Sequence, residues 1–300
     1  MLRLASWVLV ALASLLLASC AVEEPAAPAP TTAAHAPTTS ASQLQGLTAS
    51  VYQSRMDVAA GQVEAQLTNG SGIGFTVRRL SLESTGFRSP MTSGLSGIMI
   101  GPGRVVDLPV PLGGAVCAGD SLAYEVHLDY ELDDGRTGTV VVPASDQGGR
   151  MADLHAAQCL ASEADTVATL TLTGPPEERE LAGTLVADLT VAVAPAGGTG
   201  ELELVRVRNT TLLQFVDPDT GERQPDGHPV AVTVAGGDNP STIVLTVVPA
   251  CCDAHAIADD KQGTRFRVDV RLDGREGTVT VAAPEVTTAL YGFVQRACAG

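Results

Sequence analysis

The chain contains an internal repeat, and no other feature limits its fold as strongly. The segment Asp134-Gly-Arg-Thr-Gly-Thr-Val-Val-Val142 matches Asp273-Gly-Arg-Glu-Gly-Thr-Val-Thr-Val281 at an offset of 139 residues. Cys159 and Cys298 are separated by the same 139 residues. Self-similarity at a fixed spacing is typical of a duplicated structural unit. The repeat therefore predicts that most of the chain consists of two related modules.

The residues in front of each copy of the repeat alternate between apolar and polar side chains. An alternation with a period of two is typical of a β-strand with one buried face. The Asp-Gly pairs that follow tolerate the positive φ that a tight hairpin requires. Each module is therefore expected to contain a hairpin, whose first strand buries Tyr124, Val126, Leu128, Tyr130 and Leu132 in one module and Phe266, Val268, Val270 and Leu272 in the other.

The remaining patterns complete an all-β prediction. About seven short strands per module, separated by Gly, Pro and Asp turns, are typical of an immunoglobulin-like sandwich. We therefore expect two tandem β-sandwich modules, at residues 47–160 and 161–300. Pro109 and Pro111 place their strand at a sheet edge, because proline cannot donate to a ladder. The other expected strands are 48–54, 62–68, 75–83, 104–112, 166–173, 184–194, 201–208, 230–235 and 241–248.

Each module is expected to end in a short helical segment held by a disulfide bond. Apolar residues recur at helical spacing in 284–298 and more weakly in 149–159. Cysteines outside the cytoplasm usually pair, and the repeat pairs Cys117 with Cys159. In the second module the repeat pairs Cys298 with Cys251 or Cys252, and of these we predict the bond from Cys252 to Cys298. Cys251 is then spare, as a free thiol, a metal ligand or a link to another chain.

The first residues have the pattern of an export signal. Arg3 is followed by an apolar run from Leu4 to Leu17, which is shorter than a membrane-spanning helix needs. The run ends in Leu17-Ala18-Ser19-Cys20, which resembles the bacterial lipobox. We expect a signal peptide at 1–19 and a lipid on the Cys20 thiol. Residues 20–46, rich in Ala, Pro and Thr, are expected to form a tether on the extracytoplasmic face of the cell membrane.

Charge limits the partners of such a protein. The chain has 18 Lys and Arg against 34 Asp and Glu, and loss of Arg3 with the signal would leave a net charge of −17. Nucleic-acid binding needs a basic stripe, so nucleic acid is not an expected partner. The membrane is expected to be contacted only through the lipid anchor. The expected partner is another protein or ligand of the cell envelope.

Two segments carry groups of potential ligands. Cys251, His255 and Asp259 combine a thiol, an imidazole and a carboxylate, so a metal-handling protein is one alternative. Asp253 equally explains the region as the N-cap of a short helix extending to Lys261. The acidic segment 217–226 has the oxygen-rich look of a calcium loop, but it lacks the ligand spacing of an EF-hand and is expected to form a turn.

No catalytic, cofactor or phosphate-loop motif occurs in the sequence. The segment Cys252-Asp-Ala-His-Ala-Ile-Ala-Asp-Asp-Lys-Gln-Gly-Thr264 resembles a C-terminal segment of uncharacterised secreted proteins and lipoproteins from high-GC Gram-positive bacteria. This resemblance implies an extracytoplasmic location and no particular activity. The leading hypothesis is thus a non-enzymatic lipoprotein of the cell envelope without a cofactor. The alternatives are a metal-handling protein and an enzyme whose site has no recognisable motif.

Overall fold

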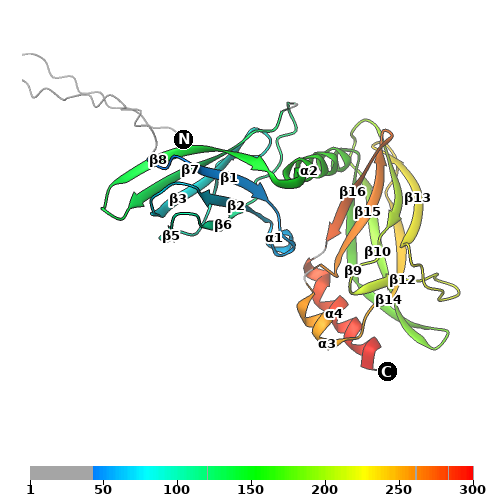
Figure 1. Ribbon diagram of the computed structural model, residues 1–300. Helices are drawn as coiled ribbons and strands as arrows, with labels where there is room; N and C mark the ends of the chain where they lie inside the picture. Colours follow the sequence, from blue (N-terminus) through cyan, green and yellow to red (C-terminus); the bar gives the residue numbers. More distant parts are fainter. Residues whose placement is uncertain (1–42, 120, 261, 283, 300) are drawn as a thin grey trace, which may run out of the picture. The chain divides into compact units, whose positions relative to one another are not determined.

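The computed structural model describes residues 43–119, 121–260, 262–282 and 284–299. It is mostly β, with 50% strand and 19% helix (Figure 1). The predicted signal peptide, Cys20 and nearly all of the predicted tether lie outside the described residues. The described helices are α1 (Arg55–Ala60), α2 (Arg150–Val167), α3 (Ala254–Asp259) and α4 (Pro284–Ala299).

The first half of the described chain forms one eight-stranded sheet. Its order is β4-β3-β7-β8-β1-β2-β6, with β5 paired to β3. All neighbours are antiparallel except β1 and β8, which run parallel. The prolines of β6 lie at an edge, as predicted. The strands are β1 (Leu47–Tyr52), β2 (Gln62–Asn69), β3 (Phe75–Ser84), β4 (Met91–Thr92), β5 (Ile98–Ile100), β6 (Val105–Pro111), β7 (Tyr124–Leu132) and β8 (Thr137–Asp146).

The second half forms two four-stranded sheets, in the orders β12-β14-β10-β9 and β13-β11-β15-β16. The short β12 had no sequence signal, and it pairs with β14. The loop that carries Cys252 therefore follows an interior strand, whereas the loop that carries Cys117 follows the edge strand β6. The strands are β9 (Ala168–Leu181), β10 (Thr184–Pro195), β11 (Glu201–Val207), β12 (Leu213–Phe215), β13 (His228–Ala235), β14 (Ser241–Pro249), β15 (Arg265–Leu272) and β16 (Arg275–Ala282).

Buried apolar side chains form a separate large cluster in each half of the chain. In the second half, both sheets contribute to one cluster, for example through Leu189 and Leu204. The first cluster includes Leu44, which is 2% exposed. The folded part therefore begins at or before Leu44, earlier than the predicted start at residue 47. Burial of an apolar side chain of this size stabilises the fold by about 1.5–3 kcal/mol.

Helix α2 crosses the predicted module boundary. Met151 near its start belongs to the first cluster, whereas Leu160, Ala164 and Val167 belong to the second. The latter three are spaced at i, i+4 and i+7, which places them on one helical face. The stretch 161–165, directly after the predicted boundary, is therefore part of a continuous helix. Its polar residues cover the outer surface of that helix, which explains why the sequence resembles a linker.

The two predicted hairpins are confirmed, with turns of different length. In the first, the chain turns through Asp133-Asp134-Gly135, and the Leu132 amide donates to the Arg136 carbonyl at 2.8 Å. In the second, Leu272 pairs directly with Arg275. The two turn residues, Asp273 and Gly274, have φ values of 47° and 81°. Positive φ at both positions is what a two-residue hairpin turn requires.

The glycines at matching positions of the repeat allow close packing in each half. A Cβ on Gly138 would lie 2.6 Å from the Tyr130 hydroxyl, and a Cβ on Gly277 would lie 2.6 Å from Leu160 Cδ1. In the first half the covering side chain comes from the neighbouring strand. In the second half it comes from α2, which contacts the edge strand β16 (Figure 1). Covering an edge strand with a helix protects it from pairing with other chains.

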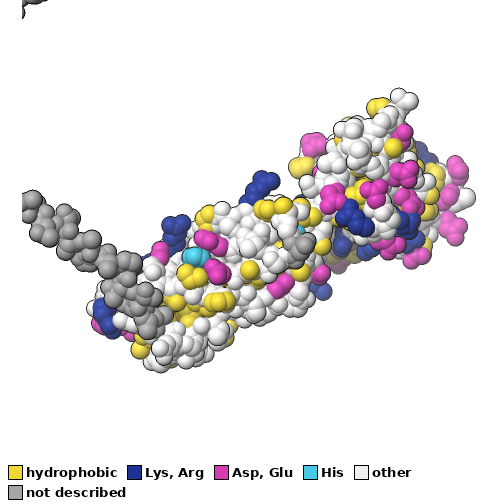
Figure 2. Space-filling view, turned by 90° about the horizontal axis from the view of Figure 1, so that it is seen from above, with side chains coloured by type: hydrophobic (Ala, Val, Ile, Leu, Met, Phe, Trp, Pro, Cys, Tyr) yellow, Lys and Arg dark blue, Asp and Glu magenta, His cyan; other side chains and the backbone are white. Residues whose placement is uncertain are grey.

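The described surface carries both signs of charge. On the face in view in Figure 2, acidic and basic side chains lie interspersed. Several form ion pairs across strands, such as Arg208 Nε to Asp269 Oδ1 at 2.7 Å. Of the helices in the described part of the chain, none is long and apolar enough to cross a membrane.

Candidate functional site

Both predicted disulfide bonds are present. Cys117 bonds to Cys159 across 42 residues, and Cys252 bonds to Cys298 across 46 residues. Each bond joins a loop after a strand to a helix, α2 in the first case and α4 in the second. The helix at 284–298 is confirmed, and the one at 149–159 is confirmed and extends to Val167. The positions of the two bonds agree with the repeat.

Cys251 is the free thiol, and it is half-buried. The predicted helix start after it is also confirmed, since the Asp253 carboxylate accepts hydrogen bonds at 2.9 Å from the amides of His255 and Ala256. His255 has a side chain that is 98% exposed, and Asp259 is exposed as well. Over the described ranges, no group of three or more His, Cys, Asp and Glu side chains is placed so that it could hold a metal ion. The structure thus does not assemble Cys251, His255 and Asp259 into a site.

The acidic segment that begins at Asp217 is a turn, as predicted. One oxygen of the Asp217 carboxylate accepts hydrogen bonds from the amide of Asp219 at 3.1 Å and from the amide of Thr220 at 2.8 Å. Val216 and Arg223 pair across it as an isolated bridge. The carboxylate oxygens are therefore used in closing the turn, and these hydrogen bonds lower the pKa of Asp217.

The described histidines of the folded halves make local contacts. His155 Nε2 lies 3.1 Å from the Val116 carbonyl oxygen, close to the first disulfide bond. His228 Nδ1 lies 3.0 Å from Gln224 Oε1, and burial lowers the pKa of this imidazole. The first contact holds a loop against helix α2, and the second holds a loop against strand β13. His155 Nε2 also lies 3.7 Å from Cys159 Sγ, but that sulfur is bonded to Cys117. These contacts do not place an imidazole beside a serine or free cysteine nucleophile as acyl-transfer chemistry would need.

A pair of carboxyl groups in the first half was not anticipated from the sequence. Asp57 is 1% exposed and lies in α1, where its carboxylate accepts hydrogen bonds of 2.8 Å from the Ser54 amide and the Gln62 side chain. Burial, the charge of Asp57 and a hydrogen bond to Asp57 raise the pKa of Glu64 to about 7. The two residues come from a short helix and the next strand. The sequence signal that could have revealed them is the Ser54-x-x-Asp57 capping box.

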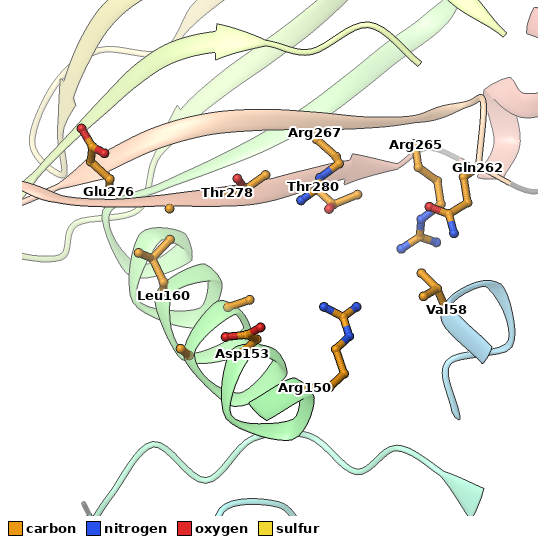
Figure 3. A pocket seen from close by; sticks show the side chains of 13 residues that line it. Val58, Arg150, Asp153, Leu160, Gln262, Arg265, Arg267, Glu276, Thr278 and Thr280 are labelled. Carbon is orange, nitrogen blue, oxygen red and sulfur yellow. The ribbon is translucent and has the colours of Figure 1, made fainter. Parts of the chain in front are cut away.

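A pocket of about 520 Å³ lies between α2 and the hairpin of β15 and β16. Figure 3 shows the guanidinium groups of Arg150, Arg265 and Arg267 around the same space. Gln262 and Thr280 line it as well, and its volume is within the range of small-molecule sites. The sequence contained a signal for this pocket, because Arg265 and Arg267 alternate with buried residues on the predicted strand. The alternation by itself indicates a hairpin strand with one buried face, and it does not indicate what lies opposite the exposed face.

No protein-family model and no curated protein matches the chain. Among solved structures, it is similar to the CsuC–CsuE chaperone–tip adhesion subunit complex of the Acinetobacter baumannii Csu pili, with 10% identity over 74% of this chain and 91% of that chain, at a TM-score of 0.19. The CupB2 chaperone of Pseudomonas aeruginosa gives 12% identity over 74% and 92%, at 0.20. The exo-chitosanase CsxA of Amycolatopsis orientalis gives 16% identity over 78% and 26%, at 0.19. Likenesses at such low TM-scores carry no argument about this chain.

Proposed function

We propose that this chain is an exported lipoprotein, held at the outer face of a membrane by a lipid on Cys20. In this proposal residues 1–19 are removed, a tether follows, and two tandem immunoglobulin-like sandwich modules bind another component of the cell envelope without catalysing a reaction. The two disulfide bonds carry the proposal. Disulfides persist in oxidising compartments, so their presence agrees with the export signal read from the first twenty residues.

The modular organisation is supported by three agreements between the halves. The hairpins of the repeat occupy equivalent positions, namely β7 with β8 and β15 with β16. Each half has a large hydrophobic cluster of its own. Each half also has one disulfide bond from a loop to a helix. Separate cores with repeated internal connections are typical of tandem domains.

A binding role is supported by the pocket beside α2, because regular elements hold the polar side chains that line it. The pocket in Figure 3 is lined by side chains on one helix and two paired strands. Side chains on regular elements are held more firmly than those on loops, which lowers the entropy lost when a ligand binds. Among the described residues, no cluster of His, Cys, Asp and Glu side chains favours the metal-handling alternative.

Lipid attachment can be tested by labelling cells with radioactive palmitate. The wild-type chain should be labelled and should fractionate with the membrane. Cys20→Ser should carry no label, because the thiol that accepts the diacylglycerol is missing. Cys251→Ser is the matched control and should be labelled like the wild type. Equal labelling of Cys20→Ser and wild type would contradict the proposed anchor.

The binding role can be tested by crosslinking in intact cells, followed by affinity purification under denaturing conditions. A defined envelope component should be recovered with the wild-type chain. It should be lost when both disulfides are removed by Cys159→Ser and Cys298→Ser together, because the modules would lose their fold. If wild type and the double variant yield the same crosslinked species, the folded modules do not select the partner.

A further inference from the structure

We propose that the pocket between α2, β15 and β16 binds a phosphate monoester. This inference adds a ligand to the proposed function. It rests on the proposed function in one respect only, the extracytoplasmic compartment in which the ligand would be present. The pocket is formed by a helix from one side and a hairpin from the other. The proposal rests on the arginines that surround it and on the charge of the chain as a whole.

The first observation is that two of these arginines lack a partner in an acidic chain. Five other arginines of the described second half pair with carboxylates, as Arg179 does with Asp188 at 2.7 Å, whereas Arg206 and Arg223 form no ion pair there. Within the described ranges, the side chains of Arg265 and Arg267 make no ion pair and no hydrogen bond. The chain holds 34 acidic residues against 18 basic ones, so partners of opposite charge are abundant. Leaving two guanidinium groups unpaired beside a pocket favours an external anion.

The second observation is the spacing of these two groups. Arg265 and Arg267 are both exposed on β15, and they lie on the same face because Phe266 between them is buried. Their α-carbons are therefore about 6.6 Å apart, at about 3.3 Å per residue. Like charges at this distance repel each other, and an anion placed between them would relieve that repulsion.

The third observation is that α2 supplies a further cation. Arg150 extends into the same space in Figure 3, and its Nη2 donates at 2.8 Å to Gln53 Oε1, a neutral group that leaves its charge uncompensated. Asp153 also lines the pocket from α2, and Glu276 lines it from β16. Three positive charges against these two carboxylates leave one in excess, which attracts a phosphate monoester with its charge of about −1.5 to −2 at neutral pH. Glu276 also forms an ion pair with Arg271 at 3.4 Å, which offsets part of its charge.

Neutral donors complete the match. The Thr280 side chain lies across the strand pair from Arg267, since these residues are in register. Gln262 lies at the end of β15 that carries Arg265. A hydroxyl and an amide can bond to the remaining phosphate oxygens or to hydroxyl groups of the esterified alcohol. The volume of about 520 Å³ leaves room for such an alcohol beside the phosphate.

The test is isothermal titration of the full mature chain, in an uncharged detergent, with glycerol 3-phosphate, inorganic phosphate and glycerol. We expect one molecule of glycerol 3-phosphate per chain and no binding of glycerol. The double variant R265Q/R267Q should bind at least tenfold more weakly, because it loses two positive charges and their charged hydrogen bonds to the phosphate oxygens. The matched control R79Q/R104Q removes two exposed arginines of the first half and should bind like the wild type.

Each result decides the proposal. Tighter binding of glycerol 3-phosphate than of inorganic phosphate supports an ester as the ligand, such as a lipid headgroup or a polymer unit. Equal binding of the two compounds overturns the ester and leaves free phosphate as the ligand of the pocket. The inference is overturned if neither phosphate compound binds at about 10 mM, a concentration well above typical ligand affinities. It is also overturned if R265Q/R267Q binds as tightly as the control. Such a failure would leave palmitate labelling and crosslinking unaffected, so the proposed function would be judged separately.

Discussion

The described cysteines have two different roles. Cys117, Cys159, Cys252 and Cys298 form the two bonds, and Cys251 stays free although its neighbour is bonded. A disulfide stabilises chiefly by restricting the unfolded chain, so the length of the closed loop determines its contribution. The free thiol closes no loop, and its contribution is limited to packing.

Replacing Cys298 with Ser should therefore lower the free energy of unfolding by about 4 kcal/mol, the value expected for closing a loop of this length. Cys251→Ser should change it by less than about 0.5 kcal/mol, as is usual for a partly exposed side chain. Guanidinium titration without reductant measures both. A loss of equal size in Cys251→Ser would show that the bond involves Cys251.

Glu64 should make the stability of the first half depend on pH. Its pKa is raised from an ordinary value of 4.5 to about 7 in the folded chain. A raised pKa stabilises the fold fully below the unfolded value, and that contribution is lost as the pH rises through about 7. Asp57 behaves in the opposite sense: burial works against ionisation, but hydrogen bonds from Ser54 and Gln62 lower its pKa below 3.8, so its contribution is lost only in acid.

Glu64→Gln should thus reduce the change of stability with pH. The amide stays neutral and can still donate to Asp57, so the variant should melt higher than the wild type at pH 8 and lose this advantage at pH 5. Thermal melts at several pH values between 5 and 8 measure the effect. Glu180→Gln, at an exposed position, should run parallel to the wild type. Parallel curves for Glu64→Gln would show that the carboxyl is ionised throughout.

Helix α2 packs against the second half and contributes apolar side chains to its core. It carries Cys159 of the first disulfide, and its side chains at Leu160, Ala164 and Val167 enter the second cluster. The Glu163 carboxylate pairs with Arg275, at the start of β16. This packing requires a residue without a side chain at position 277. The same element forms one wall of the pocket in Figure 3, so the packing of α2 also determines the shape of that pocket.

Gly277→Ala should destabilise the second half by about 1–3 kcal/mol, because its Cβ would overlap with Leu160. In a chain that already carries Leu160→Ala, the same change should cost clearly less, since the overlapping atoms are gone. A double-mutant cycle from denaturant titrations measures this coupling. Additive effects would show that Leu160 does not lie over Gly277 in solution.

The continuity of α2 changes how the whole molecule can be divided. A cut between residues 160 and 161, the predicted boundary, passes through a helix whose last two turns, about eight residues, pack into the second core. A fragment of residues 162–300 lacks Leu160, which is 8% exposed in the full chain. A fragment of residues 150–300 keeps the whole helix together with the second disulfide bond. In the fragment 150–300 the edge strand β16 is covered by the whole of α2, whereas in the fragment 162–300 most of this cover is missing.

The fragment 150–300 should unfold cooperatively by circular dichroism. The fragment 162–300 should be less stable by about 2 kcal/mol or more, from the lost burial of Leu160 alone, and should tend to aggregate through the uncovered edge of β16. Guanidinium titrations and light scattering compare the two. Equal stability would show that the first turns of α2 contribute nothing to the second core.

The sequence determined the features that depend on local pattern and on duplication. The alternation before Asp134 and Asp273 predicted both hairpins, since a period of two has a single structural meaning over eight residues. The repeat predicted Cys117 as the partner of Cys159 and limited the partner of Cys298 to Cys251 or Cys252. Pro109 and Pro111 predicted that β6 lies at an edge, because proline has no amide hydrogen to donate to a neighbouring strand. These predictions hold because each depends on neighbouring residues or on a comparison of the chain with itself.

Only the tertiary structure decided the features that arise from contacts between distant segments. Nothing in the residues 161–165 distinguishes a polar linker from the exposed side of a helix, because the difference lies in what Leu160 and Val167 contact. The carboxyl pair of Asp57 and Glu64 and the group of Arg150, Arg265 and Arg267 likewise join separate elements. Burial and charge depend on these spatial neighbours, so the pKa of Glu64 and the pocket beside α2 could not be obtained from local pattern.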